Sequence, residues 1–367
     1  MKYVLSTIAW VESIAKKEIE RQGGVIEDVI DRVITFSWWV EMIPKMNLWS
    51  RVWNKVYMLL AEEENVKDFD TLFDVVKDIK WRKYFKKDFP IVVKTSTTRS
   101  DLFASRTIQS LWKKAIIKSL VWERWTVNED DSLEKMEILL LLVDNKLRVL
   151  LNTSGNALHM RGYRSQAWEA PIKESLAAAL VLLWDWRFRD DFYDPFCGSG
   201  TIAIEALMIA KNIAPGLKRK FAFEKLWLVD PEITAKEREL AKTKSFDGDY
   251  SIRASDIDPE MIDIAKENAA RAWVAWEINF EVKDFKEYLD KDLFGTLVSN
   301  PPYGERLKDE NIKGLYNNID KLFRVNPSLW WGIITSYLEF DNQIKKDAYK
   351  KRKLYNWGEK CYFWRKK

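Results

Sequence analysis

Residue types that several common functional classes need are scarce in this 367-residue chain. It contains two cysteines, Cys197 and Cys361, and one histidine, His159. Two cysteines cannot build a disulfide framework or a zinc cluster, and a single histidine excludes a multi-histidine metal centre. We therefore expect no bound metal. The low cysteine content is also what a reducing cytoplasm would give.

Long hydrophobic runs are lacking as well. The run at residues 138–143 has the length of a β-strand, whereas a membrane-spanning helix needs about 20 apolar residues. The N-terminus has neither the apolar core nor the small-residue cleavage site of a signal peptide. These features predict a cytoplasmic protein with no membrane partner.

Glycine is scarce and tryptophan is abundant, with 13 glycines against 19 tryptophans. Average usage would give roughly 25 glycines in a chain of this length. Trp273 follows a helical run at the place of a left-handed cap, where glycine is preferred. Trp357 follows Asn356 between two strand-like runs, where Asn-Gly would form a tight turn. Eight more tryptophans lie next to loops or small residues in comparable places: Trp10, Trp112, Trp122, Trp168, Trp184, Trp227, Trp276 and Trp331.

We infer that the source reads one stop codon as glycine and that these positions were translated as tryptophan. The alternative is a tryptophan-rich protein whose aromatic surfaces stack on bases. Because both interpretations explain the composition, tryptophan abundance does not count here as a sign of nucleic-acid binding.

The net charge of +4 is mild, but the basic residues cluster. One cluster comprises Arg99, Arg106, Lys113, Lys114 and Lys118, and a second is the run Lys350, Lys351, Arg352 and Lys353. Each is either a solvated face or a surface that contacts phosphates, and charge alone does not decide between them.

The order of strand-like and helical patterns predicts three parts. Residues 1–65 read as a small α+β unit. Residues 66–155 read as a second unit, with a helix over 105–120 that carries the first basic cluster apart from Arg99, and a hairpin around Asp144-Asn145. Residues 156–367 alternate regularly between strands and helices, which is typical of a doubly wound parallel sheet in an α/β domain.

The first motif is the octet DPFCGSGT, residues 194–201, between a strand and a helix. Gly198 and Gly200 allow a tight turn and close approach of the backbone to a ligand. The octet is not a phosphate-binding loop, because the Gly-Lys-Ser/Thr ending is missing. Asp194 at the strand tip would repel a pyrophosphate, but it suits a ligand that carries an ammonium or sulfonium group.

Two aspartates follow the next strands. Asp256, which comes before Ile257, is placed to accept hydrogen bonds from ribose hydroxyls, and Asp258 is better placed to cap the following helix. Asp284 stands just past the strand at residues 279–282, where it could receive an adenine amino group. Either aspartate alone would be a cap or a surface residue; their order favours a ligand pocket.

The fourth motif, Asn300-Pro301-Pro302-Tyr303, follows a strand over residues 296–299. The exocyclic amine of a base is a poor nucleophile because its lone pair is delocalised into the ring. The Asn300 side-chain oxygen and the Pro301 carbonyl can accept the two amine hydrogens and stabilise the positive charge that develops on nitrogen. Consecutive prolines keep the loop rigid, and Tyr303 offers a face on which an extruded base can stack.

Together, residues 194–201, Asp256 and residues 300–303 resemble the class I amino-methyltransferases. The segments 159–164 (HMRGYR) and 170–174 (APIKE) narrow the resemblance to RNA methyltransferases with an N-terminal ferredoxin-like region and a THUMP domain. The chain is most similar to the bacterial large-subunit ribosomal RNA guanine-N2 methyltransferases of the L type. Some members carry a second methyltransferase domain downstream, and that activity is expected to be absent here because the sequence stops at Lys367.

The resemblance implies a Rossmann-like methyltransferase domain over residues 156–367, a THUMP RNA-binding domain over 66–155 and a ferredoxin-like region over 1–65. It implies S-adenosylmethionine as the cofactor and RNA, most simply ribosomal RNA, as the partner. The cofactor would be held by Asp194, Phe196, Gly198, Gly200, Asp256, Ile257 and Asp284, with residues 170–174 also near its pocket. Asn300, Pro301 and Tyr303 would handle the base, and Arg99, Arg106, Lys113 and Lys114 would bind RNA. His159 and Arg161 would lie where the RNA-binding and catalytic parts join.

Three alternatives stay open. The motif serves N6 of adenine in RNA or DNA as well as N2 of guanine, since both are aromatic amines. Transfer RNA competes with ribosomal RNA as the substrate. A non-catalytic RNA-binding assembly factor is a third interpretation, against which the intact motifs count.

Overall fold

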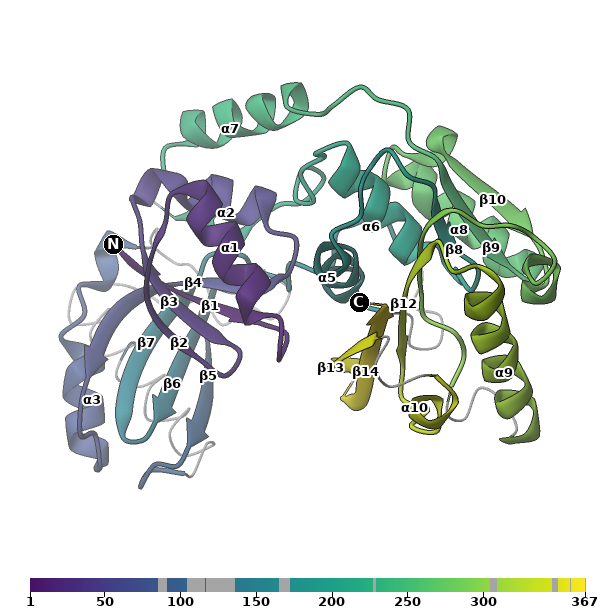
Figure 1. Ribbon diagram of the computed structural model, residues 1–367. Helices are drawn as coiled ribbons and strands as arrows, with labels where there is room; N and C mark the ends of the chain where they lie inside the picture. The colour runs from purple at the N-terminus through teal and green to yellow at the C-terminus, as the bar shows by residue number, and fades with distance from the viewer. Residues whose placement is uncertain are drawn as a thin grey trace. The chain divides into compact units, whose positions relative to one another are not determined.

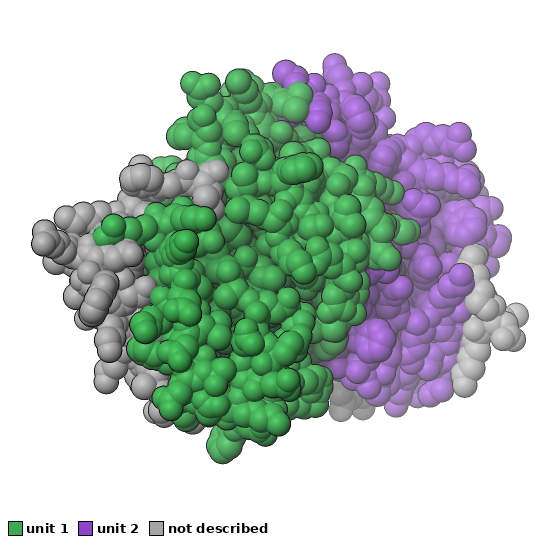
Figure 2. Space-filling view, turned by 90° about the vertical axis from the view of Figure 1, so that its left-hand side faces the viewer, with its two compact units in different colours: residues 1–6, 16–158, 219–240 green, residues 7–15, 159–218, 241–367 purple. Residues whose placement is uncertain are grey.

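The computed structural model describes residues 1–84, 91–103, 116, 136–164, 172–226, 229–303, 309–344, 349–356 and 358–366. The expected helix over 105–120, with Arg106, Lys113 and Lys114, lies outside these residues apart from Ile116. The chain forms two compact units, drawn in green and purple in Figure 2. Unit 1 comprises residues 1–6, 16–158 and 219–240, and unit 2 comprises residues 7–15, 159–218 and 241–367.

Unit 1 is built on one seven-stranded sheet in the order β2-β3-β1-β4-β7-β6-β5 (Figure 1). The strands are β1 (Lys2–Thr7), β2 (Val25–Ile30), β3 (Val33–Ser37), β4 (Trp53–Glu63), β5 (Ile91–Thr98), β6 (Met136–Val143) and β7 (Lys146–Asn152). Strand β4 pairs antiparallel with β7, so the strands from residues 1–65 and those from 66–155 share one sheet. The helices of this region are α1 (Glu12–Gln22), α2 (Ile43–Trp49) and α3 (Phe69–Lys77).

The hairpin expected around residues 144 and 145 is present in unit 1. Strands β6 and β7 are antiparallel with Val143 opposite Lys146. Asp144 and Asn145 have φ of 51° and 62°, which is the left-handed conformation that a two-residue turn of this kind requires and that these two residue types tolerate.

Residues 219–240 belong to unit 1 although the sequence places them inside the α/β region. Arg219 donates hydrogen bonds of 2.6 and 2.7 Å to the carbonyls of Ala157 and Asn156. Helix α7 (Pro231–Thr243) carries Glu237, whose carboxylate accepts a 2.8 Å hydrogen bond from the Trp49 indole. The α/β fold is therefore interrupted by a segment that packs on the N-terminal unit.

Unit 2 is a doubly wound sheet in the order β10-β9-β8-β11-β12-β14-β13. The strands are β8 (Phe192–Asp194), β9 (Ile252–Asp256), β10 (Ile278–Val282), β11 (Gly295–Ser299), β12 (Leu329–Thr335), β13 (Tyr349–Asn356) and β14 (Glu359–Lys366). The first five in the sheet order are parallel, and β14 and β13 close the edge as an antiparallel hairpin. The chain order reverses between β8 and β11, which is where such sheets bind ligands.

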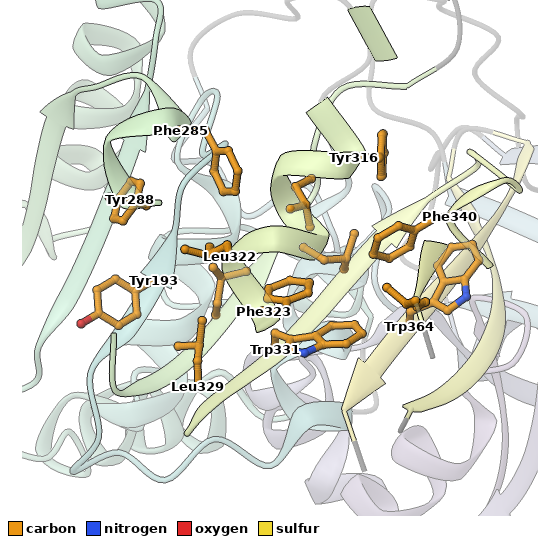
Figure 3. Close-up of a cluster of buried hydrophobic side chains, with 14 of the residues drawn as sticks. Tyr193, Phe285, Tyr288, Tyr316, Leu322, Phe323, Leu329, Trp331, Phe340 and Trp364 are labelled. Atoms are coloured by element: carbon orange, nitrogen blue, oxygen red, sulfur yellow. The ribbon is translucent and has the colours of Figure 1, made fainter. Parts of the chain in front are cut away.

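Helices cover both faces of this sheet: α5 (Glu174–Trp184), α6 (Thr201–Ala210), α8 (Pro259–Arg271), α9 (Asp309–Val325) and the short α10 (Phe340–Gln343). The side chains under α9 form a largely aromatic core, shown in Figure 3. Within it the rings of Phe323 and Trp331 stack with centroids 4.2 Å apart and planes 2° apart. This core anchors β11 and its neighbour β12, and the Asn300 motif follows the carboxyl end of β11.

Among the tryptophans singled out by the sequence, Trp10, Trp273 and Trp331 differ in backbone and packing, while Trp112, Trp122, Trp168, Trp227 and Trp357 lie outside the described residues. Trp10 and Trp273 have φ of 70° and 62° and are more than half exposed, a combination rarely found for a bulky residue. Trp273 ends α8 as the left-handed residue of a Schellman cap, with Val274 N–H bound to the Ala269 carbonyl at 2.9 Å. Trp331, in contrast, is buried. The backbone thus favours glycine at two of these positions and gives Trp331 a packed environment.

No helix in the described part of the chain is both long enough and apolar enough to span a membrane. Within the same residues, no group of three or more histidine, cysteine, aspartate or glutamate side chains could hold a metal ion.

Candidate functional site

A cavity of about 820 Å³ opens at the carboxyl ends of the parallel strands of unit 2, within the size range of cofactor sites. The octet at residues 194–201, Asp256, Asp284 and the Asn300 motif all contribute to its wall. The lining residues are Ile172, Pro195–Thr201 except Gly200, Ile202, Asp256, Ile257, Met261, Lys283–Lys286, Asn300, Pro302, Gly314, Leu315 and Asn318.

The two glycines of the first motif have different tasks. Gly198 has φ +49°, and a Cβ placed on it would meet nothing within 4 Å, so its backbone faces open space in the cavity wall. Gly200 has φ +80°, and its Cβ would lie 3.0 Å from Ala265 Cβ and 3.2 Å from Phe280 Cε1. Gly198 therefore leaves room for a ligand, and Gly200 lets the start of α6 approach α8 and β10 closely.

Asp256 is the last residue of β9 and links two motifs. Its Oδ2 accepts a 2.9 Å hydrogen bond from the Gly198 N–H, and its Oδ1 accepts one of 3.1 Å from the Asp258 N–H. Each carboxylate oxygen keeps a second lone pair for a ligand hydroxyl. Asp258 caps α8 by accepting from Glu260 N–H at 2.9 Å, as expected.

Asp284 and Ile257 also line the cavity. Asp284 Oδ1 accepts a 2.9 Å hydrogen bond from the Lys286 N–H and so caps a short turn of helix over Phe285–Tyr288. Ile257 is 67% exposed, and Phe285 follows Asp284 directly. The wall here combines the apolar Ile257 and Phe285 with the Asp284 carboxylate, flanked by Lys283 and Lys286; the apolar surface and the carboxylate suit a planar base whose edge carries an amino group.

Asp194 lies beneath the turn and is not among the lining residues of the cavity. It is buried, and its Oδ1 accepts a 2.5 Å hydrogen bond from Ser299 Oγ. Its Oδ2 is buried without a hydrogen-bond partner in the described structure. Burial raises its pKa to about 7, with the Ser299 hydroxyl acting in the opposite direction. Asp194 thus connects the first motif to the residue that precedes Asn300.

Asn300 and Pro302 line the cavity. The Asn300 side-chain oxygen Oδ1 is buried and accepts no hydrogen bond in the described structure. A buried acceptor left unpaired costs about 1–3 kcal/mol, so such an atom commonly marks the place where a ligand donates.

Tyr303 does not line the cavity. Its ring is buried and its hydroxyl accepts a 3.1 Å hydrogen bond from Asn356 Nδ2, while the Cys361 thiol lies 3.5 Å away. The sequence suggested a stacking platform, whereas this structure directs the phenol into the C-terminal hairpin. Burial raises the pKa of this phenol far above its usual range, so the ring stays neutral.

A buried ionic network behind the cavity was not expected from the sequence. Arg164 donates to Thr201 Oγ1 at 2.7 Å and lies 3.5 Å from the Glu174 carboxylate. Arg161, expected where the RNA-binding and catalytic parts join, is buried in unit 2 and lies 3.5 Å from Glu205. Burial raises the pKa of Glu174. The network fixes the start of α6, and with it the glycine turn.

Other lining residues also escaped the sequence analysis. Gly314, Leu315 and Asn318 come from α9, and Phe285 follows Asp284. The adjacency of Phe285 to a candidate aspartate was a usable signal. For the residues of α9 that line the cavity, the sequence contained no comparable signal.

Arg99 is the one predicted RNA-binding residue that the structure describes. Its guanidinium makes two 2.7 Å hydrogen bonds to the carboxylate of Asp144 at the tip of the β6–β7 hairpin, and both side chains are exposed. The Asp144 carboxylate therefore partly offsets the positive charge of Arg99.

The described residues fit S-adenosylmethionine. Asp256 offers a carboxylate for ribose hydroxyls, and Asp284 with Ile257 and Phe285 offers a slot for adenine. Gly198 leaves the space that a side chain would fill.

Comparison with known proteins gives a family match for the α/β region and another for part of the N-terminal region. A family model described as RMKL-like, methyltransferase domain, matches residues 161–363, and a THUMP domain model matches residues 66–140. The "Putative RNA methyltransferase YpsC" of Bacillus subtilis strain 168 is 36% identical over 365 residues, covering 97% of this chain and 93% of the relative. The ribosomal RNA large subunit methyltransferase K/L of Aliivibrio salmonicida is 33% identical over 94% of this chain, which spans only 47% of that protein.

Two solved structures resemble this chain over nearly its whole length. SMU.472, determined in complex with SAH, has a TM-score of 0.90 at 33% identity and covers 99% of this chain and 97% of its own. A Listeria monocytogenes protein, described as a predicted N6-adenine-specific DNA methylase, has a TM-score of 0.90 at 33% identity, with coverage of 99% and 95%. The chain therefore belongs to the RMKL-like methyltransferase family, and it is an S-adenosylmethionine-dependent RNA methyltransferase with a THUMP domain.

Proposed function

We propose that this enzyme methylates the exocyclic N2 of a guanine in 23S ribosomal RNA. The observation that carries the proposal is the buried, unpaired Oδ1 of Asn300 in the cavity wall, because an exocyclic amine is the donor that such an acceptor lacks. The ribosomal substrate is supported by the name of the K/L relative.

Asn300 and Pro301 would act together on the amine. Asn300 Oδ1 accepts one amine hydrogen and the Pro301 carbonyl accepts the other, which directs the nitrogen lone pair along the line of attack. Both oxygens stabilise the positive charge that grows on nitrogen as the new bond forms. Two consecutive prolines hold these acceptors in place before the substrate arrives. The methylated ammonium is acidic and loses its proton without a strong general base.

The cofactor would be held by the residues predicted for it. Asp256 binds the ribose and Asp284 the adenine edge, with Ile257 against the ring. Phe196, Gly198 and Gly200 shape the turn around the methionine part. When bound, S-adenosylmethionine supplies an electrophilic methyl group on sulfur. Asp194 acts from beneath, through Ser299, on the position of Asn300.

The RNA-binding role of Arg99, Arg106, Lys113 and Lys114 stays a prediction, as does the division into residues 1–65, 66–155 and 156–367. The stacking role of Tyr303 would require its ring to leave the contact with Asn356.

N6 of adenine is the second candidate target, because the Listeria relative is described as acting there and the motif chemistry is the same. Incubation with labelled cofactor and either protein-free 23S ribosomal RNA or transfer RNA, followed by nucleoside mass spectrometry, separates the possibilities. We expect N2-methylguanosine from the ribosomal RNA. N6-methyladenosine, or label in transfer RNA alone, would reject the proposal, and RNA binding without transfer would favour an assembly factor.

A further inference from the structure

The two C-terminal strands form the most basic segment of unit 2. Among residues 349–366, seven are basic and one, Glu359, is acidic, although the chain as a whole carries only +4. Strands β13 and β14 pair antiparallel along their whole length, from Tyr349 opposite Lys366 to Asn356 opposite Glu359. Because β13 is the edge strand of the sheet, the hairpin has a neighbouring strand on the β12 side only.

Strand alternation sorts the side chains of this hairpin onto two faces. One face carries a set that we name the lysine–tyrosine surface: Lys351, Lys353, Tyr355, Lys360 and Tyr362. In the register of the hairpin, Lys353 stands opposite Tyr362 and Tyr355 opposite Lys360. Each of these two cross-strand pairs therefore places a lysine opposite a tyrosine.

The ammonium groups of this surface lie over its rings. Lys351 Nζ is 4.2 Å and Lys360 Nζ 5.2 Å from the Tyr362 centroid, and Lys353 Nζ is 5.1 Å from the Tyr355 centroid. A hydrogen bond from Lys360 and the charges of Lys360, Lys351 and Lys353 lower the pKa of the Tyr362 phenol. Three ammonium groups therefore lie close to the Tyr362 side chain.

Two of these lysines are not neutralised. Lys351 is 2.8 Å from the Asp341 carboxylate. In the described part of the chain, no carboxylate forms an ion pair with Lys353 or Lys360. The contacts that the structure describes for their ammonium groups are with aromatic side chains, so their charge is available to an anion.

The surface ends beside the catalytic motif. Asn356 and Cys361 point to the opposite face of the hairpin, where they contact the Tyr303 hydroxyl. Their chain neighbours Tyr355, Lys360 and Tyr362 point to the lysine–tyrosine face. Tyr362 is also opposite Thr335, the last residue of β12, at the end of the sheet where the cavity opens.

We propose that the lysine–tyrosine surface binds the single-stranded RNA that flanks the target nucleotide, with Lys353 and Lys360 on its phosphates and the tyrosines against its bases. A base reaches such a pocket only when it is unstacked or extruded, and the adjoining strand must then pass this end of the sheet. Basic grooves with interleaved aromatic rings are the usual means of holding single strands. An acidic protein would use the lysines but would not explain the tyrosines paired with them or the position next to the motif. The proposal rests on the proposed function only in taking RNA as the substrate.

The test compares the double variant Lys353→Ala/Lys360→Ala with Lys266→Ala/Lys321→Ala, which removes two exposed lysines from α8 and α9 of the same unit. The probe is a fluorescein-labelled 20-nucleotide single-stranded RNA, titrated across a salt series. The slope of log K, the RNA association constant, against log salt concentration is negative. Loss of two phosphate contacts should make it shallower by about 1.4 and weaken binding about tenfold at low salt. The control variant should keep the original slope, and Lys353→Arg/Lys360→Arg should restore it. Unchanged affinity for SAH shows that the variants are folded.

An unchanged slope and affinity in the double variant would overturn the proposal. Unchanged RNA binding together with lost binding of polyglutamate would overturn it in favour of an acidic protein partner. The KM for ribosomal RNA separates this proposal from the proposed function. If N2-methylguanosine forms at an unchanged KM in the double variant, only the RNA surface is wrong. If the RNA slope becomes shallower as expected but no N2-methylguanosine forms with the unmodified enzyme, only the guanine assignment is wrong.

Discussion

The backbone N–H of Gly198 donates a 2.9 Å hydrogen bond to Oδ2 of Asp256, which joins the glycine turn after β8 to the end of β9. The carboxylate that is available to a ribose therefore also fixes the turn that leaves room for the rest of the cofactor. One side chain orders both halves of the site.

Replacement of Asp256 by asparagine should weaken cofactor binding. The amide oxygen can still accept from Gly198, but the NH₂ group cannot accept from a ribose hydroxyl. A lost hydrogen bond to a charged group is worth about 1.5–3 kcal/mol, so we expect the Kd for SAH in calorimetry to rise by at least about tenfold. Asp258→Asn is the matched control, since that side chain only caps α8. Equal Kd values for both variants would disprove the ribose role.

Asn300→Ala should leave the Kd for SAH nearly unchanged and lower kcat by on the order of 10²-fold. The physical reason is that the alanine variant lacks one of two acceptors for the amine hydrogens, while the cofactor contacts remain. Single-turnover transfer of labelled methyl to ribosomal RNA measures the effect. If the alanine variant turns over at the original rate, Asn300 Oδ1 does not accept an amine hydrogen of the target base.

Much of the site could be predicted because its motifs share one position in the fold. Residues 194–201, Asp256, Asp284 and Asn300 each stand at the carboxyl end of a parallel strand, and those ends meet at one edge of the sheet. Local sequence therefore sufficed to place most of them around one cavity, with Asp194 beneath its glycine turn.

The remaining features depend on contacts between distant segments. Tyr303 is directed by Asn356, 53 positions away, and α7 is held by a bond between Trp49 and Glu237 across 188 positions. Nothing in the local pattern at residues 231–243 tells that this helix packs on unit 1. The face of α9 that lines the cavity is likewise set by the core in Figure 3 rather than by its own sequence.

Asp194 predicts a specific pH dependence of stability in the cofactor-free protein. Its folded pKa is about 7, against 3.8 in the reference state. Between these values the folded protein holds a proton that the unfolded chain has released, so stability falls as pH rises through this window. In Asp194→Asn the side chain stays neutral, and its unfolding free energy should decline less between pH 4.5 and 7. Urea unfolding of both proteins checks this, and parallel profiles would refute the raised pKa.

The inferred recoding predicts the mass of peptides from the natural protein. Peptides that contain positions 10 and 273 should have the mass of glycine at those positions, because the backbone there is left-handed and the side chains are exposed. Tandem mass spectrometry of the protein purified from its source measures this directly. Tryptophan at both positions would end the hypothesis.

The same hypothesis makes a separate prediction about stability for the tryptophan-containing chain. In Trp273→Gly the backbone stays left-handed, but the strain of roughly 1–2 kcal/mol that this conformation costs a residue with a Cβ is relieved. The variant also loses an exposed ring, to whose centroid Lys218 Nζ lies at 3.5 Å. We expect the unfolding free energy to rise by about 1 kcal/mol. Trp331→Gly is the opposite case, because that ring is buried and stacks on Phe323, and it should lose at least about 3 kcal/mol. Chemical denaturation of both variants compares them. If Trp273→Gly destabilises the chain as much as Trp331→Gly, the Trp273 ring contributes packing that outweighs its backbone strain, and the structural argument for glycine at that position fails.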